Sequence, residues 1–568
     1  MKLSGAEIII KLLEKAGIDK IAGIPGGSNL PIYEALFHSK IKHILTRHEQ
    51  AAGFIAQGIA RASGKPGVCI ATSGPGATNL ITSIADADMD SIPIIAITGQ
   101  VSSKLLGTDA FQEVDIIRIT KPITKKNYLI SKAEELLDII PEAFRIAVEG
   151  RPGPVLIDIP KDIQTSIIDI EPSIFNNIDF YQEKQQTFSF SSSIIEKLER
   201  IIRMIDYSEK PVIYAGGGII HSDSSGILLE FAKKNSIPIT TTLLGLGSVC
   251  KSEPLNLGMP GMNGAPFTNH ILNECDLLLA FGVRFDDRAT CCLKKFCKNA
   301  IIAHIDIDAS ELNKLKTAQA AAACDIKNAI DYMLPRIKHN QRECWLGRID
   351  ELKKKYPVIE PAPDDINHPV NIIKEIGKAA DEDAIIITDV GQHQMWTAQF
   401  YPFRMPRTFL TSGGFGTMGF GLPAAIGAAL VMPEKQIICI SGDGSIFMNI
   451  QELATLAELK LNIKIIIFNN NHLGLVRQQQ ELFYNKTFIG SKFIAESNFR
   501  NIARAFGING IDIREKNFYN DNPPISYHSI FSEAFNNNGP CLIDIPIDSE
   551  INVLPMVPPG AGIIEMIS

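Results

Sequence analysis

No stretch of the sequence approaches the roughly twenty consecutive apolar residues that a membrane-spanning helix needs. The opening residues, MKLSGAEIIIKLLEKAGI, do not resemble a signal peptide, because the apolar run is short and no small-residue cleavage site follows it. Instead, Ile8, Leu12, Leu13 and Ala16 recur at helical spacing, which predicts an amphipathic helix.

The chain also lacks a basic face, a clustered set of cysteines and a short-period repeat. A net charge of −8 argues against a nucleic-acid or anionic-membrane partner, and the local run at 353–355 indicates a solvated helix face. Cys291, Cys292 and Cys297 have no second cluster or His pair at zinc spacing, so we expect reduced thiols and a cytoplasmic location. The absence of repeats excludes a solenoid.

What the sequence does contain is a series of short, continuously apolar runs that alternate with helical patterns. Continuous runs indicate strands buried on both faces, and hence parallel sheets covered by helices. The runs are VCIAT (68–72), PIIAIT (93–98), PVLIDI (154–159), PVIYAG (211–216), LLLAFG (277–282), AIIITD (384–389), QIICIS (436–441) and IKIIIF (463–468).

Two polar stretches, 164–193 and 338–368, divide this series. A chain of 568 residues is too long for one hydrophobic core. We therefore predict an α/β fold of three doubly wound parallel-sheet domains. Their predicted bounds are 1–165, 190–340 and 365–550, and a closing tail follows at 551–568.

Polar residues follow two of the predicted strands in the third domain. Gly442, Asp443 and Gly444 come after QIICIS, and Asn470 follows IKIIIF. Ligands bind at the carboxyl ends of such strands, and one carboxylate with one amide oxygen suits Mg²⁺. We expect the glycines to admit a phosphate, and the helix predicted at 448–459 to offer it an N-terminus. The alternative is a tight turn and an unrelated Asn-rich loop.

A set of distinctive stretches lies in order along nearly the whole chain. They are GIPGGSNLPIYEAL (23–36), TRHEQAA (46–52), TSGPGATNL (72–80), GTDAFQE (107–113), GRPGPVLIDIPKD (150–162), FGVRFDDR (281–288), DVGQHQMW (389–396), SGGFGTMGFGLPAAIG (412–427) and VPPGAG (557–562). In these stretches the chain resembles the large, catalytic subunit of acetohydroxyacid synthase (acetolactate synthase), a thiamine-diphosphate-dependent enzyme family.

The resemblance implies a pyrimidine-binding, a central FAD-binding and a diphosphate-binding domain, with thiamine diphosphate, Mg²⁺ and FAD as cofactors. Glu49 would activate thiamine diphosphate, because a carboxyl bonded to the pyrimidine ring favours the tautomer that removes the reactive proton. The alternative for Glu49 is a surface residue that caps the following helix. Gly27 and Gln112 match further catalytic positions, and His472 joins Asp443 and Asn470 as a metal ligand.

The resemblance also assigns residues to the two organic cofactors. The thiamine diphosphate positions are Val390, Gly391, Gln392, His393, Gly416, Met418, Gly442, Gly444 and Ser445. The flavin positions are Arg151, Gly216, Gly217, Gly218, Thr242, Leu243, Gly261, Met262, Gly282, Arg284, Asp286, Arg288, Asp306, Ile307 and Asp325. In the family, thiamine diphosphate lies between two subunits, with Glu49 on one chain and Asp443 on the other.

For the substrate, the resemblance implies that Arg288 holds the carboxylate of the second 2-keto acid, for which a guanidinium gives bidentate recognition. The alternative is an ion pair with Asp286 or Asp287. Phe111, Gln112 and Lys161 match positions around the substrate entrance.

The sequence departs from the family pattern at a few of these positions. Gln479 replaces the usual Trp that packs against the extra methyl group of 2-ketobutanoate, which predicts a weaker preference for that acceptor over pyruvate. Asn263 stands where His is usual and Ser83 where many members have Pro, which puts nearby flavin and inhibitor contacts in doubt.

The function that the resemblance implies is the decarboxylation of pyruvate and the transfer of its two-carbon unit to a second pyruvate or to 2-ketobutanoate. These are early steps towards valine, leucine and isoleucine. A homodimer and a small regulatory subunit are the implied partners. The rival hypotheses are a pyruvate-oxidase-like enzyme and an inactive thiamine-diphosphate-binding scaffold.

Overall fold

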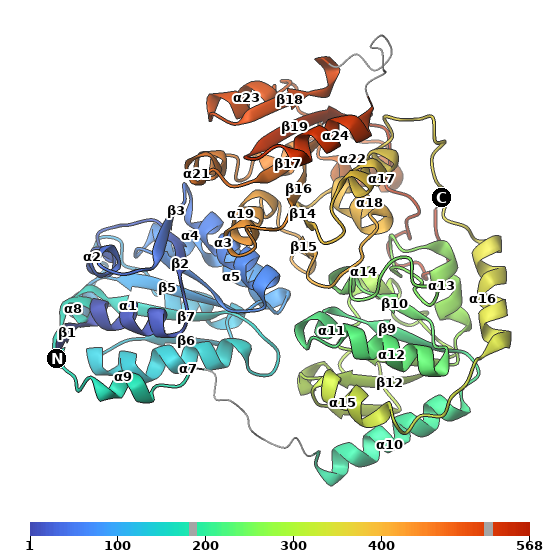
Figure 1. The fold of residues 1–568 in the computed structure, drawn as a ribbon, viewed down its shortest axis with the longest axis horizontal. Coiled ribbons are helices and arrows are strands. Elements are labelled where there is room, and N and C mark those ends of the chain that lie inside the picture. Colours follow the sequence, from blue (N-terminus) through green and yellow to red (C-terminus); the bar gives the residue numbers. More distant parts are fainter. Residues whose placement is uncertain (181–189, 516–525, 568) are drawn as a thin grey trace.

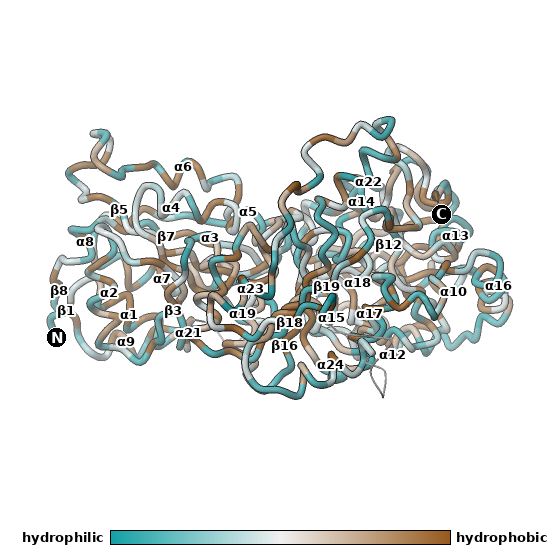
Figure 2. Tube along the Cα trace, turned by 90° about the horizontal axis from the view of Figure 1, so that it is seen from above, coloured by the Kyte–Doolittle hydropathy of each residue, from teal (hydrophilic) through white to brown (hydrophobic). Residues whose placement is uncertain are grey.

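Buried apolar strands form the centre of three parallel sheets in the computed structural model, which describes residues 1–180, 190–515 and 526–567 (Figure 1). All the strands predicted from apolar runs are confirmed. They are β4 (Gly67–Ala71), β5 (Ile94–Gln100), β7 (Val155–Pro160), β9 (Pro211–Ala215), β11 (Leu277–Phe281), β14 (Ile385–Thr388), β16 (Ile437–Gly442) and β17 (Ile463–Asn469). Figure 2 shows the trace around β16 in brown, the colour of hydrophobic residues, at the centre of the molecule.

The first sheet has the order β3-β2-β4-β5-β7-β6, in which β2 is Lys20–Gly23, β3 is Lys42–Leu45 and β6 is Lys126–Leu129. One face packs against α1 (Gly5–Lys15), α2 (Leu30–Phe37) and α7 (Leu136–Val148), and the other against α3 (Glu49–Ser63) and α5 (Ile81–Met89). The predicted amphipathic helix is α1, which begins after Ser4, whose Oγ accepts from Glu7 N at 3.2 Å.

The central sheet has the order β10-β9-β11-β12-β13, in which β10 is Ile239–Thr241, β12 is Ile301–Asp306 and β13 is Ala320–Ala323. Helices α10 (Ser192–Tyr207), α12 (Ser225–Asn235) and α15 (Ile326–Met333) cover one face. Helices α13 (Pro266–Glu274) and α16 (Glu343–Lys355) cover the other. The run at 353–355 forms the predicted helix face, in the last turn of α16.

The third sheet has the order β15-β14-β16-β17-β19-β18, in which β15 is Phe409–Thr411, β18 is Asn509–Asp512 and β19 is Cys541–Pro546. Helices α17 (Pro369–Ala379), α18 (Gln392–Phe400) and α24 (Tyr527–Asn536) lie on one face. Helices α19 (Gly421–Val431), α21 (Glu452–Leu459) and α23 (Phe499–Ala505) lie on the other. Three parallel-sheet α/β domains therefore confirm the predicted fold class.

The two polar stretches that separate the predicted domains contain helices and a strand. Stretch 164–193 includes β8 (Ile167–Asp169), which pairs antiparallel with β1 (Lys2–Ser4), and α9 (Ser173–Asn177); positions 181–189 lie outside the described residues. Stretch 338–368 includes α16, which buries Trp345, Ile349 and Leu352 against the central domain. The exact domain bounds stay a prediction, and positions 516–525 and 568 also lie outside the described residues.

The closing tail runs from the third domain to the central domain and forms hydrogen bonds with both (Figure 1). Val553 N donates to Gln478 Oε1 at 2.8 Å, on helix α22 (Gly474–Phe483). Farther along, Val557 N donates to Met262 O at 2.9 Å and Cys292 N donates to Ala561 O at 3.0 Å. Across the described parts of the chain, no helix is long and apolar enough to cross a membrane.

The first and third domains share one hydrophobic core, because α3 packs directly on α19. A Cβ added to Gly58 would lie 2.1 Å from Ala424 O, and one added to Gly427 would lie 2.1 Å from Ile55 O. Only hydrogen at these positions lets the two helix backbones approach so closely.

We therefore expect Gly58→Ala to lower the melting temperature, because the added methyl group must push α19 away. Overpacking of this kind costs about 1–3 kcal/mol. The control is Gly347→Ala on the exposed side of α16, where a Cβ meets nothing within 4 Å and the helix should gain about 0.5–1 kcal/mol. Thermal melting followed by circular dichroism distinguishes the two; equal shifts would contradict the close contact.

Candidate active site

Asp443 and Asn470 lie side by side, as the strand order requires. Strands β16 and β17 pair in parallel with Gly442 opposite Phe468, and each polar residue comes directly after its strand. The Asp443 carboxyl is 3% exposed, and its Oδ2 has no hydrogen-bond partner among the described residues. Burial raises the pKa of Asp443 to about 7, while backbone N–H groups of Gly444 and Asn470 act to lower it. A cation would offset the cost of burying this charge.

The other two predicted metal ligands, Asn470 and His472, form hydrogen bonds with each other and with Gln392 at the start of α18. Asn470 Nδ2 donates to Gln392 Oε1 at 3.2 Å, and its Oδ1 accepts from His472 N at 3.0 Å. The ring Nδ1 of His472 lies 2.7 Å from Asn470 O. Within the described ranges, no group of three or more His, Cys, Asp and Glu side chains is gathered as a metal site. Oxygen from Asp443 and Asn470 is therefore what this site offers a hard cation.

Glycines and a buried histidine form the floor beside Asp443. A Cβ on Gly391 would lie 2.7 Å from the His393 ring, and one on Gly442 would lie 3.0 Å from it. Burial lowers the pKa of His393 to about 3, so its ring is neutral, and its Nε2 has no partner among the described residues. The glycine backbone leaves room for a diphosphate to approach. The unpaired His393 Nε2 and Asp443 Oδ2 are suited to the diphosphate and its metal.

One detail of the predicted diphosphate site is wrong. The helix expected at 448–459 begins at Glu452 as α21, whereas the helix that follows β16 directly is the short α20 (Asp443–Ile446). The glycine turn is tight enough to start a helix at once, because Gly442 N donates to Ser445 Oγ at 3.1 Å. Val390 precedes α18, and Gly416 and Met418 lie on the loop before α19.

Glu49, Gly27 and Gln112 gather around the turn at 72–74, which follows β4, and the short α4 (Pro75–Asn79). Asn79 Nδ2 donates to Glu49 Oε2 at 2.9 Å, and a Cβ on Gly76 would lie 3.3 Å from Glu49 Oε1. A Cβ on Gly74 would lie 2.9 Å from the backbone of Gln112. Beside Gly27, Ser28 Oγ lies 2.8 Å from Ser73 Oγ.

The helix-cap alternative for Glu49 is not what the structure has. His48 caps α3, where its Nδ1 accepts from Gln50 N at 3.1 Å, and Glu49 is the first residue of the helix. Its carboxyl is half-buried at the surface of the first domain, so a covering partner would be needed to make the pocket dry.

A cavity of about 1810 Å³ opens where the strands of the central sheet end. Among the predicted flavin positions, all except Gly261 line it. Gly261 lies behind the wall, where a Cβ would meet Arg288 O at 2.4 Å. The glycine turn after β9 packs on the turn after β11, since a Cβ on Gly216 would lie 2.1 Å from Gly282 O. The volume and the strand-end position fit a dinucleotide such as FAD.

Two arginines, one from the first domain and one from the central domain, line the cavity. Arg151, from the first domain, donates from Nε to Ser91 Oγ at 2.8 Å and contacts Glu311 Oε1 at 3.2 Å. Arg284 Nη1 lies 3.4 Å from Met89 Sδ. At the end of β12, burial raises the pKa of Asp306 to about 6.

The predicted substrate residues are spread over three places. Arg288 lines the cavity, and among the described residues it forms one ion pair, with Asp287 at 3.7 Å. Both side chains are largely exposed, so that pair contributes little. Asp286 instead caps the short α14 (Asp287–Thr290). Phe111 is 88% exposed, and Lys161 is an exposed residue at the start of α8 (Lys161–Thr165).

The three departures lie in different surroundings. Gln479 is exposed on α22, next to the buried Gln478 that holds the tail. Asn263 lines the large cavity and donates from Nδ2 to Pro555 O at 3.2 Å. Ser83 is buried against α3, where a Cβ on Gly53 would lie 1.9 Å from its Oγ.

Comparison with known proteins matches the three domains to three family models of thiamine pyrophosphate enzymes. The N-terminal TPP binding domain matches residues 3–119, the central domain 198–333 and the C-terminal TPP binding domain 389–545. The chain is 49% identical to the acetolactate synthase isozyme 1 large subunit of Escherichia coli, over 100% of this chain and 98% of that protein. The chain belongs to the acetolactate synthase large-subunit family.

Further members of the family are also similar over their whole length. Identity is 43% with isozyme 2 of E. coli, over 100% of this chain and 99% of that protein. It is 41% with the chloroplastic acetolactate synthase of Arabidopsis thaliana, over 99% of this chain and 84% of that protein. The predicted family and thiamine diphosphate as cofactor are thereby confirmed, whereas the roles of single residues stay predictions.

We expect Asp443→Ala to abolish Mg²⁺-dependent binding of thiamine diphosphate. The affinity should fall by more than the 10–100-fold that is usual for outer ligands of a metal, because Asp443 offers the only unpaired buried carboxylate oxygen among the described residues. Calorimetric titration measures the affinity, and an unchanged melting temperature without cofactor shows that the fold is intact. Tight Mg²⁺-dependent binding by the variant would contradict this assignment.

Proposed function

We propose that this chain is the catalytic subunit of an acetolactate synthase. It converts two pyruvate molecules into 2-acetolactate and CO₂, or one pyruvate and one 2-ketobutanoate into 2-aceto-2-hydroxybutanoate and CO₂. The observation that carries the proposal is the buried, unsatisfied pair of Asp443 Oδ2 and His393 Nε2 at the strand ends of the third domain. The full-length similarity to acetolactate synthases supports the same reaction.

Different residues would bind the cofactor and activate it. Asp443 and Asn470 would bind Mg²⁺, and the backbone of Gly391, Gly442 and Gly444 would lie against the diphosphate. When bound, thiamine diphosphate supplies a nucleophilic carbon and an electron sink for decarboxylation. Glu49 would hold a proton at its carboxyl oxygen, facing the pyrimidine ring, with Asn79 Nδ2 fixing the other oxygen at 2.9 Å.

Selection of the second keto acid falls to Arg288 and its surroundings. Its guanidinium is free to bind a carboxylate, because the ion pair with Asp287 is long and exposed. Phe111, Gln112 and Lys161 would line the entrance. Water must be kept away from this reaction, since protonation would release acetaldehyde in place of the ligated product.

A homodimer would complete the site. Glu49 bonds within the first domain and Asp443 within the third, so a second copy is what would cover the half-buried Glu49 and bring the two sets together. The name "large subunit" of the relatives supports a small regulatory subunit as a further partner. The free cysteines of the described residues agree with a cytoplasmic location.

FAD is the third cofactor of the proposal, and the cavity at the central strand ends would hold it. Arg151, Arg284 and the buried Asp306 give this cavity the charges that a phosphate and a ribose hydroxyl require. No flavin redox step enters the proposed reaction.

The central test is product analysis from pyruvate with Mg²⁺, thiamine diphosphate and FAD. We expect acetolactate, and we expect Glu49→Gln to lower kcat about 10²–10⁴-fold, because the amide cannot take part in the proton transfer. The variant keeps an acceptor for Asn79, so thiamine diphosphate should still bind. Reduced flavin would favour a pyruvate oxidase, and binding without turnover would favour a scaffold; either outcome overturns the proposal.

A second prediction concerns the choice of acceptor. Gln479→Trp should raise the preference for 2-ketobutanoate over pyruvate by about 10-fold or more, because an aromatic wall gains contact with the extra methylene. Competition between the two acceptors, read as the ratio of the products, measures this preference. Gln479→Ala serves as control, since it adds no wall and should leave the ratio unchanged; a strong preference in the unaltered chain would contradict the role of Gln479.

A further inference from the structure

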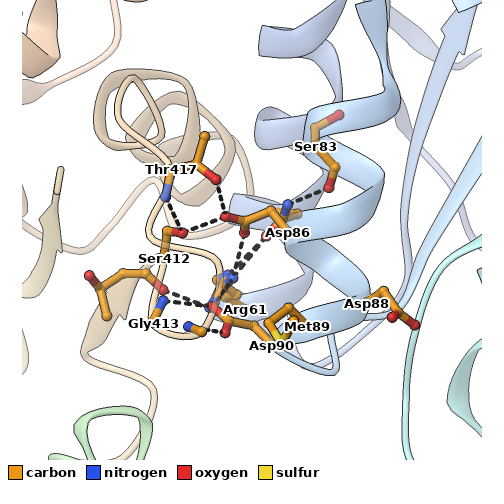
Figure 3. Close-up of polar contacts among 12 residues, drawn as sticks. Arg61, Ser83, Asp86, Asp88, Met89, Asp90, Ser412, Gly413 and Thr417 are labelled. Atoms are coloured by element: carbon orange, nitrogen blue, oxygen red, sulfur yellow. Dashed lines mark hydrogen bonds and ion pairs between the residues drawn. The ribbon is translucent and has the colours of Figure 1, made fainter. Parts of the chain in front are cut away.

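A cluster of buried charges joins the first domain to the loop before α19 (Figure 3). Arg61, on α3, contacts Asp86 Oδ1 at 3.3 Å and Asp90 Oδ2 at 2.9 Å. The side chains of all three are at most 6% exposed. None of these residues was predicted from the sequence as part of a site.

Both carboxylates hold the loop at residues 411–417. Asp90 accepts from Gly413 N at 2.9 Å and from Gly414 N at 2.7 Å. Asp86 accepts from Thr417 Oγ1 at 2.8 Å and from Ser412 Oγ. Ser412 Oγ in turn accepts from Thr417 N at 2.8 Å, so the loop is fixed at both of its ends.

Arg61 fixes the loop directly as well. Its Nη1 donates to Thr411 O at 2.9 Å, and its guanidinium lies 5.0 Å from the centre of the Phe420 ring. Side chains of the first domain therefore hold the loop from β15 to α19, together with Gln394 of α18, whose Nε2 donates to Thr411 Oγ1 at 2.7 Å and to Ser412 O at 3.0 Å.

The balance of charges in the cluster indicates that its role is to fix the conformation of the loop. One guanidinium faces two carboxylates, and the excess negative charge is met by N–H and O–H donors of the loop. Burial and the nearby Asp90 raise the pKa of Asp86 to about 6. Buried ion pairs often contribute little net stability, because desolvation offsets their attraction. What the arrangement does provide is a single geometry for the loop.

The loop lies between the two proposed cofactor sites. Gly413, Gly414, Phe415 and Gly416 line the large cavity. Gly416 and Met418 are the predicted thiamine diphosphate positions of the same loop. A shift of the loop would therefore change both sites together.

The cluster also reaches the central domain. Arg407 Nη1 donates to Arg61 O at 3.4 Å, and its Nη2 donates to Ile220 O at 3.1 Å. The next residue, His221, lines the cavity. Three domains thus meet at this point on the cavity wall.

We propose that Arg61, Asp86 and Asp90 are positioning residues that couple the binding of FAD to the binding of thiamine diphosphate, through the loop at 411–417. The inference rests on the proposed function, which supplies the two ligands. Binding of one cofactor orders the loop. The second cofactor then binds at a lower cost in conformational entropy, because the loop is already ordered.

The test is the affinity for FAD of the full chain, measured by quenching of flavin fluorescence with and without saturating Mg²⁺ and thiamine diphosphate. In the unaltered chain we expect thiamine diphosphate to tighten FAD binding about 5-fold or more, within the usual range of coupling. Asp90→Asn loses the charge and one acceptor. In this variant the affinities for FAD with and without thiamine diphosphate should agree within about twofold.

A matched control separates coupling from stability. Asp158 on β7 is also buried (1% exposed) and accepts from Thr98 Oγ1 at 2.7 Å and Gln100 Nε2 at 3.0 Å, away from the loop. Asp158→Asn should therefore change the melting temperature and keep the coupling. If Asp90→Asn does not fold, Thr417→Val removes only the hydroxyl that donates to Asp86, and should reduce the coupling by a smaller factor.

The outcomes distinguish failure of the inference from failure of the proposed function. Failure of the unaltered chain to bind thiamine diphosphate at all would reject the proposed function. Binding of both cofactors without coupling, or full coupling in both loop variants, would overturn the role of the cluster and leave the proposed function intact. Loss of coupling in Asp158→Asn as well would show that it follows general stability.

Discussion

The close contact of α3 with α19 is the constraint on which the rest of the structure depends. Because Gly58 and Gly427 let the two helix backbones touch, the first and third domains share a single core. Their sheets are then fixed relative to each other, and so are the loops at the carboxyl ends of their strands. Arg61 lies one helical turn beyond Gly58, so the same helix that joins the domains also presents the charge that holds the neighbouring loop.

The polar groups of the sites are tolerated in the core because each lies at a strand end. A parallel strand that is buried on both faces offers backbone groups only at its ends, and there the chain can turn a side chain such as Asp443 or Asp306 towards a cavity. Burial raises the pKa of both carboxyls. Asp443 keeps an unpaired Oδ2, and a ligand, rather than another side chain, is suited to satisfy it.

The sequence predicts best what depends on local pattern. Continuous apolar runs identified most of the interior strands, and the residues after β16 and β17 were expected together because parallel strands end at one edge. Edge strands such as β10 and β13 were missed, since a few buried residues carry too little pattern, and the interior strands β2, β12 and β19 were also missed. The Arg61, Asp86 and Asp90 cluster was also missed, because its partners lie more than 300 residues away in the chain and nothing local marks the pairing.

The cluster on α3 and α5 has a consequence for anyone who recombines this chain with its relatives. Its two halves, residues 57–90 and 411–420, belong to different domains but make one interlocking set of contacts. A chimera that takes its first domain from one parent and its third from another combines halves that were never selected together. Crossover points that keep both segments from the same parent would preserve the set, even though they are distant in sequence.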